Sequence, residues 1–172
     1  MDEVAGGVDR LVRLSSGVEV VLRPIGPADS DALAKGYQEL STAAAYQRLH
    51  GSVAKLSAAQ LAYLTEVDHH DHEAIIAYDP INGHGLGEAR YIRSRTDPAF
   101  AEIAVAVLDD WHGLELGHHL LEAVRDRARE EAITCLTAEV LSENAPMLAL
   151  LRGLGEVHLE RKTAVTVAHL PI

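Results

Sequence analysis

One stretch of the chain, residues 100–131, constrains the fold more than any other. It opens with the apolar run FAEIAVAVL, which predicts a strand in the middle of a sheet. The turn DDWHGLELGHH follows this run. Apolar residues then recur at helical spacing at Leu116, Leu120, Leu121, Val124 and Ala128. The spacing predicts an amphipathic helix that continues to about Glu131.

The rest of the chain predicts further strands and helices that pack around the same sheet. We expect strands over 18–25, 73–80, 86–94 and 134–141, and one or two closing strands over 157–170. We expect helices over 27–40, 41–51, 57–67 and 144–155, with Ser57 as a cap. This order predicts an α/β or α+β fold around a mixed sheet.

Length, charge and cysteine content exclude several classes of protein. The 172 residues suit one domain, which we expect to span 1–172. A net charge of -11 disfavours nucleic acid and anionic membrane as partners. The single cysteine excludes a disulfide framework, and no run approaches the roughly 20 apolar residues of a membrane span. We therefore expect a cytoplasmic protein.

The turn between the apolar strand and the helix has the features of an anion site. Gly113 and Gly117 allow the backbone to turn sharply and to approach phosphate oxygens, because glycine has no β-carbon. The first N–H groups of the helix have no partner within it and point at the same place. Two glycines before a helix also occur in ordinary tight turns, so the spacing alone leaves both interpretations open.

The segment from Ala101 to Gly155 resembles the GNAT superfamily of acyl-CoA-dependent N-acyltransferases. Its strand, loop, helix, strand and helix follow that family's order, and LRPIGPAD resembles a common GNAT opening. The segments STAAAYQRL, LTEVDHHDHEAIIA and AEIAV are similar to bacterial protein lysine acetyltransferases of the Pat type. The resemblance covers nearly the whole chain. It implies the GNAT fold, with a mixed, mostly antiparallel central sheet flanked by helices.

The resemblance also implies acetyl-CoA as co-substrate and a set of residues that bind it. Backbone groups of Val105 and Val107 would hold the pantetheine arm and polarise the thioester carbonyl. Asn144 matches an asparagine that contacts the cofactor in many members, although it could equally cap the helix that follows. The loop and the start of the helix would hold the pyrophosphate through His112, Gly113, Leu114, Glu115, Leu116, Gly117 and His118.

Glu115 departs from the family's loop pattern, which has glycine at this place. Its side chain adds a β-carbon and a negative charge where a pyrophosphate is expected. In one interpretation the carboxylate points away and leaves the helix N–H groups free for acetyl-CoA. In the other it satisfies those donors itself, and the cofactor site is degenerate.

Glu102 matches the glutamate that acts as general base in the family. Acetylation by a thioester needs a neutral amine, so a base must take a proton from the ammonium. Its apolar neighbours Ala101 and Ile103 predict that the carboxylate is partly desolvated, which would favour proton uptake. Alternatively, Glu102 only ends a strand that faces solvent. The sequence offers no clear match for a tyrosine that protonates the departing thiolate.

The run DHHDHE over 68–73 contains residue types that bind metals, but it lacks the spacing of a closed ligand set. We expect no metal there, and interpret the run as a solvated loop on the substrate side. Taken together, we expect an N-acetyltransferase, monomeric or homodimeric, that acts on a protein lysine. The alternatives are an acetyltransferase of small amines and a non-catalytic GNAT-like binding or regulatory module.

Overall fold

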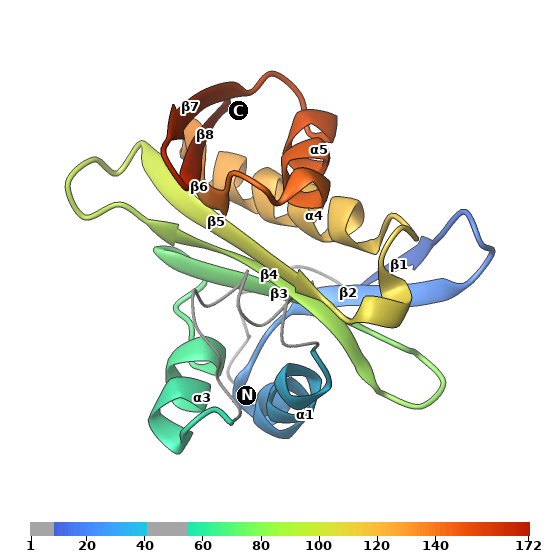
Figure 1. Cartoon of the computed structure of the whole chain (residues 1–172). Helices are drawn as coiled ribbons and strands as arrows, with labels where there is room; N and C mark the ends of the chain where they lie inside the picture. Colours follow the sequence, from blue (N-terminus) through green and yellow to red (C-terminus); the bar gives the residue numbers. More distant parts are fainter. Residues whose placement is uncertain (1–8, 41–54) are drawn as a thin grey trace.

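The computed structural model describes residues 9–40 and 55–172, which form one twisted sheet with helices on both faces (Figure 1). The eight strands lie in the order β1-β2-β3-β4-β5-β6-β8-β7. Every neighbouring pair is antiparallel except β5 and β6, which are parallel. The strands are β1 (Arg10–Arg13), β2 (Glu19–Pro24), β3 (His72–Tyr78), β4 (Gly85–Arg93), β5 (Phe100–Val107), β6 (Cys135–Leu141), β7 (His158–Lys162) and β8 (Val165–Pro171). The expected mixed, mostly antiparallel sheet is confirmed.

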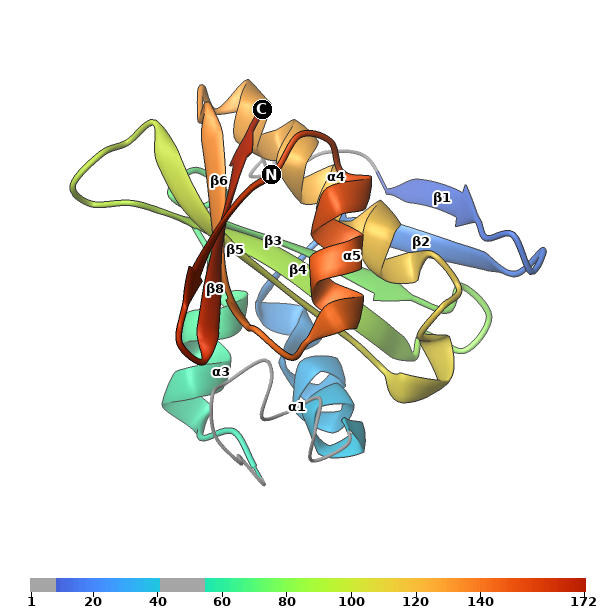
Figure 2. The same ribbon diagram turned by 45° about the horizontal axis from the view of Figure 1, so that its top comes forward.

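Helices cover both faces of this sheet, as Figures 1 and 2 show from two directions. One face carries α1 and α3, and the other carries α4 and α5. The helices are α1 (Ser30–Glu39), α3 (Ala58–Thr65), α4 (Leu116–Glu130) and α5 (Ala145–Gly153), with short 3-10 turns η1 (Pro27–Asp29) and η2 (Asp109–Trp111). The helix expected over 41–51 lies outside the described residues.

The amphipathic stripe of the longest helix packs as its periodicity predicts. Leu116, Leu120, Val124 and Ala128 are fully buried and Leu121 is 1% exposed. Each of these leucines contributes about 1.5–3 kcal/mol of burial. The helix crosses β3, β4 and β5, and its stripe joins the larger of two apolar cores. The smaller core lies under α1 and α3.

One strand was not predicted from the sequence. β1 has four residues, RLVR, and only Val12 is buried. It pairs with β2 on one side and forms an edge of the sheet. Charged residues at both of its ends interrupt the apolar alternation, so the local pattern carries too little signal for a strand.

The feature of the sheet that positions a site is the short pairing between β5 and β6. Their register runs only from Phe100↔Cys135 to Glu102↔Thr137. β5 continues for five more residues alongside β4, whereas β6 continues alongside β8. Beyond Glu102 the two parallel strands therefore separate, and a gap opens in the middle of the sheet.

Candidate functional site

A large cavity occupies the gap between β5 and β6. Its volume is about 930 Å³, and it reaches from the strands to the start of α4 and to α5. β5 lines it along its free edge from Glu102 to Val107. On the far side it is lined by residues of β6 and α5, including Ala138, Glu139, Val140, Met147 and Leu150.

The backbone of β5 presents alternate peptide groups to this cavity. On the β6 side, the carbonyl of Ala99 accepts from Cys135 N (3.1 Å) and that of Ala101 from Thr137 Oγ1 (3.4 Å). On the β4 side, Leu108 N donates to the Leu86 carbonyl (3.0 Å). Because peptide groups two residues apart point to the same edge of a strand, those of Ile103, Val105 and Val107 face the gap.

The start of α4 forms the end of the cavity near the glycine turn. The first helical hydrogen bond runs from His119 N to the Glu115 carbonyl (3.1 Å). The N–H groups of Leu116, Gly117 and His118 precede this bond and are the unpaired donors of the first turn. These three residues line the cavity. A helix of 15 residues adds the positive end of its dipole at the same point.

Glu115 turns its carboxylate away from these donors. Its Oε2 accepts a hydrogen bond from Ser15 N, at 3.3 Å, in the turn between β1 and β2. It makes no side-chain cap on α4. The interpretation in which Glu115 satisfies the helix donors itself is therefore wrong. Its backbone is left-handed, with φ 67°, a conformation that glycine adopts without strain.

The two glycines of the loop serve different ends. Gly113 has φ +73°, and a β-carbon there would meet open space. Glycine is therefore favoured at this position because it adopts the positive φ of the turn without strain. At Gly117 a β-carbon would lie 3.2 Å from Leu150 Cδ2. Gly117 therefore permits close packing of α4 against α5, in addition to exposing its own N–H. Leu114, between them, packs against the larger core.

Three polar residues predicted at the site already have partners. Nε2 of His112 donates to the Val107 carbonyl at 2.8 Å, which ties the loop to the end of β5. Asn144 Oδ1 accepts from Met147 N at 3.2 Å, so Asn144 caps α5 as well as lining the cavity. His118 lies 3.5 Å from Glu122, one turn further along α4.

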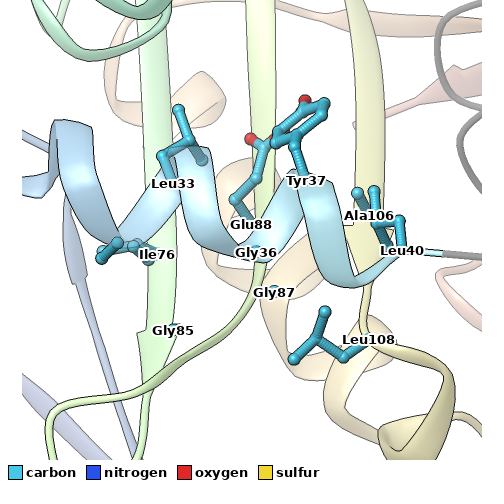
Figure 3. A pocket seen from close by; sticks show the side chains of 11 residues that line it. Leu33, Gly36, Tyr37, Leu40, Ile76, Gly85, Gly87, Glu88, Ala106 and Leu108 are labelled. Carbon is cyan, nitrogen blue, oxygen red and sulfur yellow. The ribbon is translucent and has the colours of Figure 1, made fainter. Parts of the chain in front are cut away.

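Glu102 lines the cavity but is not desolvated as we expected. Ala101 and Ile103 are buried in the core beneath α4, and Glu102, which alternates with them, is exposed on the opposite face. Ala104 and Ala106 follow Glu102 on that face of β5. Both are partly buried and line the cavity, and Ala106 lies next to Leu40, at the end of α1, in Figure 3.

A second, small pocket lies beside the large one, between α1 and strands β4 and β5 (Figure 3). It shares Leu40 and Ala106 with the large cavity. The buried carboxylate of Glu88 accepts from the Tyr37 hydroxyl at 3.1 Å and from Arg90 Nε at 2.9 Å. The contact between Tyr37 and Glu88 was not predictable from the sequence, because it joins segments that are 51 residues apart.

Trp111 and Glu139, which were not expected at the site from the sequence, also line the large cavity. Trp111 is the only tryptophan of the chain, so its fluorescence reports on this site. The position of Glu139 was predictable, because apolar and polar residues alternate in CLTAEVL. This alternation places Glu139 on the face opposite the buried Leu136, Ala138 and Val140.

The acidic and histidine-rich run over 68–73 forms the turn before β3, in which Asp68, His70 and Asp71 are exposed, and the first two residues of that strand. Glu73 is fully buried in β3, where Oε1 lies 2.8 Å from His69 Nδ1 and Oε2 lies 3.1 Å from Arg127 Nε. His70 pairs with Glu131 at the C-terminal end of α4. His72 is in register with Ile92, and Ile92 with Glu102 of the cavity lining, so the end of the run lies two strands, about 10 Å, from that end of the cavity. The run is a polar connection between β3 and α4.

The fold and this cavity define a family of enzymes. The family model described as Acetyltransferase (GNAT) family matches residues 37–155. The chain belongs to this family, whose acyl donor is acetyl-CoA. Within residues 9–40 and 55–172, no helix is long and apolar enough to span a bilayer.

Among individual proteins, the chain is similar to acetyltransferases of the Pat type. It is 30% identical over 161 residues to acetyltransferase Pat of Mycolicibacterium smegmatis. The match covers 94% of this chain and 48% of that protein, so the chain spans about half the length of this relative. The GNAT domain of S. lividans PAT superposes with a TM-score of 0.88 at 26% identity, covering 95% of this chain and 97% of that one.

A more distant structure shares the fold. A protein from Salmonella typhimurium, solved with its cofactor acetyl-CoA, superposes with a TM-score of 0.71 at 21% identity. This likeness covers 88% of our chain and 93% of that one.

The cavity of this chain fits such a donor. Its volume exceeds 300 Å³, the lower range of small-molecule sites, and it combines free strand edge with uncapped helix N–H groups. The turned-away Glu115 leaves those groups accessible. Among the lining residues that the structure describes none is Lys or Arg, and the donors that they offer a diphosphate include main-chain N–H groups and the side chain of His118.

Proposed function

We propose that this chain is an N-acetyltransferase that moves acetyl from acetyl-CoA to a primary amine, with Glu102 as general base. The observation that carries the proposal is the gap between β5 and β6 with an uncapped helix end at its mouth. The diphosphate would accept from the N–H groups of Leu116, Gly117 and His118. We also propose that the chain forms a single GNAT domain.

The chemistry follows from where these groups lie. Acetyl-CoA supplies an activated acyl group as a thioester. The N–H of Val105 would stabilise the negative charge that builds on the carbonyl oxygen as the amine attacks. Glu102, or water beside it, first takes one proton from the ammonium, and the neutral amine then attacks the carbonyl. The C–S bond breaks as the amide forms, and coenzyme A leaves as a thiolate that takes up the second proton lost by the nitrogen. Because Glu102 is exposed on the face of α1 and α3, we expect the amine to approach from that side.

A protein lysine is the acceptor that we propose. The support is the similarity to two proteins named Pat and PAT, and a net charge of -11, which would draw a cationic partner. A small amine is the alternative acceptor. Acetylation of free amines but not of lysine in peptides would favour it.

Binding of the donor is the first test. Titration of acetyl-CoA, followed by calorimetry and by the fluorescence of Trp111, should give a micromolar Kd. A non-catalytic module is the rival function, favoured by the negative charge of Glu115 and by the absence of Lys and Arg from the described cavity lining. Failure of the wild type to bind acetyl-CoA would support that rival and contradict the proposal.

The second test is the substitution Glu102→Gln. We expect acetyl-CoA affinity to stay unchanged, while turnover falls by about 100-fold or more at neutral pH, because removal of a general base typically costs this much. The loss should shrink at high pH, where more of the amine is already neutral. Glu143→Gln is the matched control, since Glu143 is exposed and does not line the cavity. Equal turnover in the two variants would remove Glu102 from its role.

A further inference from the structure

The cavity contains a carboxylate that has no role in the mechanism above. Glu139 lies on β6 and is exposed, whereas its neighbours Ala138 and Val140 are buried in the core under α4. Because side chains alternate along a strand, Glu139 stands on the opposite face, the face of α1 and α3. Glu102 stands on that same face of β5.

Glu139 lies across the gap from the proposed reaction centre. Glu102 is the last residue of β5 in register with β6, opposite Thr137. Glu139 is two residues further along β6, which is about 7 Å. It therefore lies just beyond the point at which the strands separate. Both carboxylates line the one large cavity, on the side from which the amine would approach.

The charges of the cavity point to a cationic ligand at this place. Glu102, Glu115 and Glu139 line it, and the described lining includes neither Lys nor Arg. Glu115 is turned toward Ser15, at the other end of the cavity. No ion pair or hydrogen bond of the Glu139 carboxylate occurs within residues 9–40 and 55–172. Its side chain is exposed and lines the cavity.

We propose that Glu139 determines the acceptor specificity of this enzyme, by attracting the ammonium form of the acceptor and holding it beside Glu102. This inference rests on the proposed function and deepens it. Glu139 is a positioning residue, since it holds the amine before proton transfer and takes no proton itself. Acceptors with further positive charge close to the reacting amine should be preferred, and acceptors flanked by carboxylates should be rejected.

Steady-state kinetics of Glu139→Gln test this role. The acceptors would be a lysine peptide with basic neighbours and the same peptide with acidic neighbours. We expect the KM of the basic peptide to rise about two- to fivefold, which is the range of an exposed ion pair, with little change in kcat. Glu139→Lys should raise the KM of the basic peptide tenfold or more, and so reduce the difference in KM between the basic and the acidic peptide. Added salt should reduce both effects.

Two controls separate the role of Glu139 from the proposed acetyltransferase function. Glu143→Gln removes the same charge outside the cavity and should match the wild type in every parameter. Binding of acetyl-CoA, followed by Trp111 fluorescence, should stay within about twofold in the Glu139 variants. Unchanged acceptor KM in both Glu139 variants, with an active wild type, would overturn the specificity role and leave the proposed function standing. A wild type that acetylates no amine would overturn the proposed function, and the acceptor role with it.

Discussion

At the scale of single residues, Glu115 decides whether the loop can hold an anion. Its left-handed backbone is the conformation that the glycine of the family pattern adopts at no cost, and a residue with a β-carbon loses about 1–2 kcal/mol there. The hydrogen bond from Ser15 N holds the carboxylate off the helix end. The charge nevertheless remains close to the N–H groups that we expect to bind phosphate.

Replacement of Glu115 should therefore strengthen donor binding. Like charges about 4 Å apart in a water-like dielectric repel by about 1 kcal/mol, so Glu115→Gly should lower the Kd of acetyl-CoA about fivefold. Glu115→Gln removes the same charge and keeps the strained backbone, so it should lower the Kd alike. Calorimetry of both variants at low and high salt measures this. A weaker affinity in both variants would contradict this prediction, whereas a weaker affinity in Glu115→Gly alone would show that the contact with Ser15, which a glutamine oxygen can still make, helps to shape the loop.

At the scale of elements, helix caps and packing shape the walls of the cavity. Asn144 caps α5, and that helix brings Met147 and Leu150 to the cavity. Gly117 lets α4 approach Leu150 closely enough for the two helices to pack. The position of this wall thus depends on a cap and on a missing side chain.

Loss of the cap should destabilise the protein by a predictable amount. Asn144→Ala should lower the free energy of unfolding by about 1 kcal/mol, and Asn144→Ser, which can still accept from Met147 N, should restore most of it. Urea denaturation measures both variants. The affinity for acetyl-CoA, measured for the same variants, separates the capping role of Asn144 from a contact with the cofactor. If the side-chain amide contacts the cofactor, both variants should bind acetyl-CoA more weakly. No loss of stability in Asn144→Ala would contradict the capping role.

Elements with strong local patterns were predictable from the sequence, and the shape of the site was not. The stripe from Leu116 to Ala128 defined α4, because each of its residues faces the same core. The charged residues at both ends of β1 left too little apolar alternation to predict that strand. The end of the β5–β6 register and the contact between Glu115 and Ser15 depend on residues far apart in the chain. Local periodicity carries no information on either. The exposure of Glu102 was misjudged because its apolar neighbours Ala101 and Ile103 point to the opposite face of the strand.

At the scale of the whole molecule, buried polar groups connect the sheet to helices on both faces. Glu73 and Arg127 join β3 to α4. On the opposite face, Arg90 Nη1 lies 3.0 Å from His72 Nε2 and 3.2 Å from the Leu64 carbonyl of α3. Because Arg90 is always charged, this arrangement requires His72 to accept with a neutral ring. Protonation of His72 would therefore break this contact and place two cations side by side.

This contact predicts how stability changes with pH. Burial, and then the charge of Arg90, lower the pKa of His72 to about 4 from its ordinary value near 6.5. Between these values the unfolded chain binds a proton that the folded protein does not. Acidification from pH 6.5 to 4 should therefore lower the free energy of unfolding, and His72 should add nothing to the slope above pH 6.5.

The substitution His72→Gln isolates this contribution, because a glutamine carbonyl can accept from Arg90 without binding a proton. We expect the Tm of the wild type, measured at half-unit steps of pH, to fall more steeply between pH 6.5 and 4 than that of the variant. His158→Gln, which removes an imidazole whose side chain is 64% exposed, should keep the slope of the wild type. Parallel curves of Tm against pH for the wild type and His72→Gln would contradict this prediction, because removal of the imidazole would then leave the acid sensitivity of the Tm unchanged.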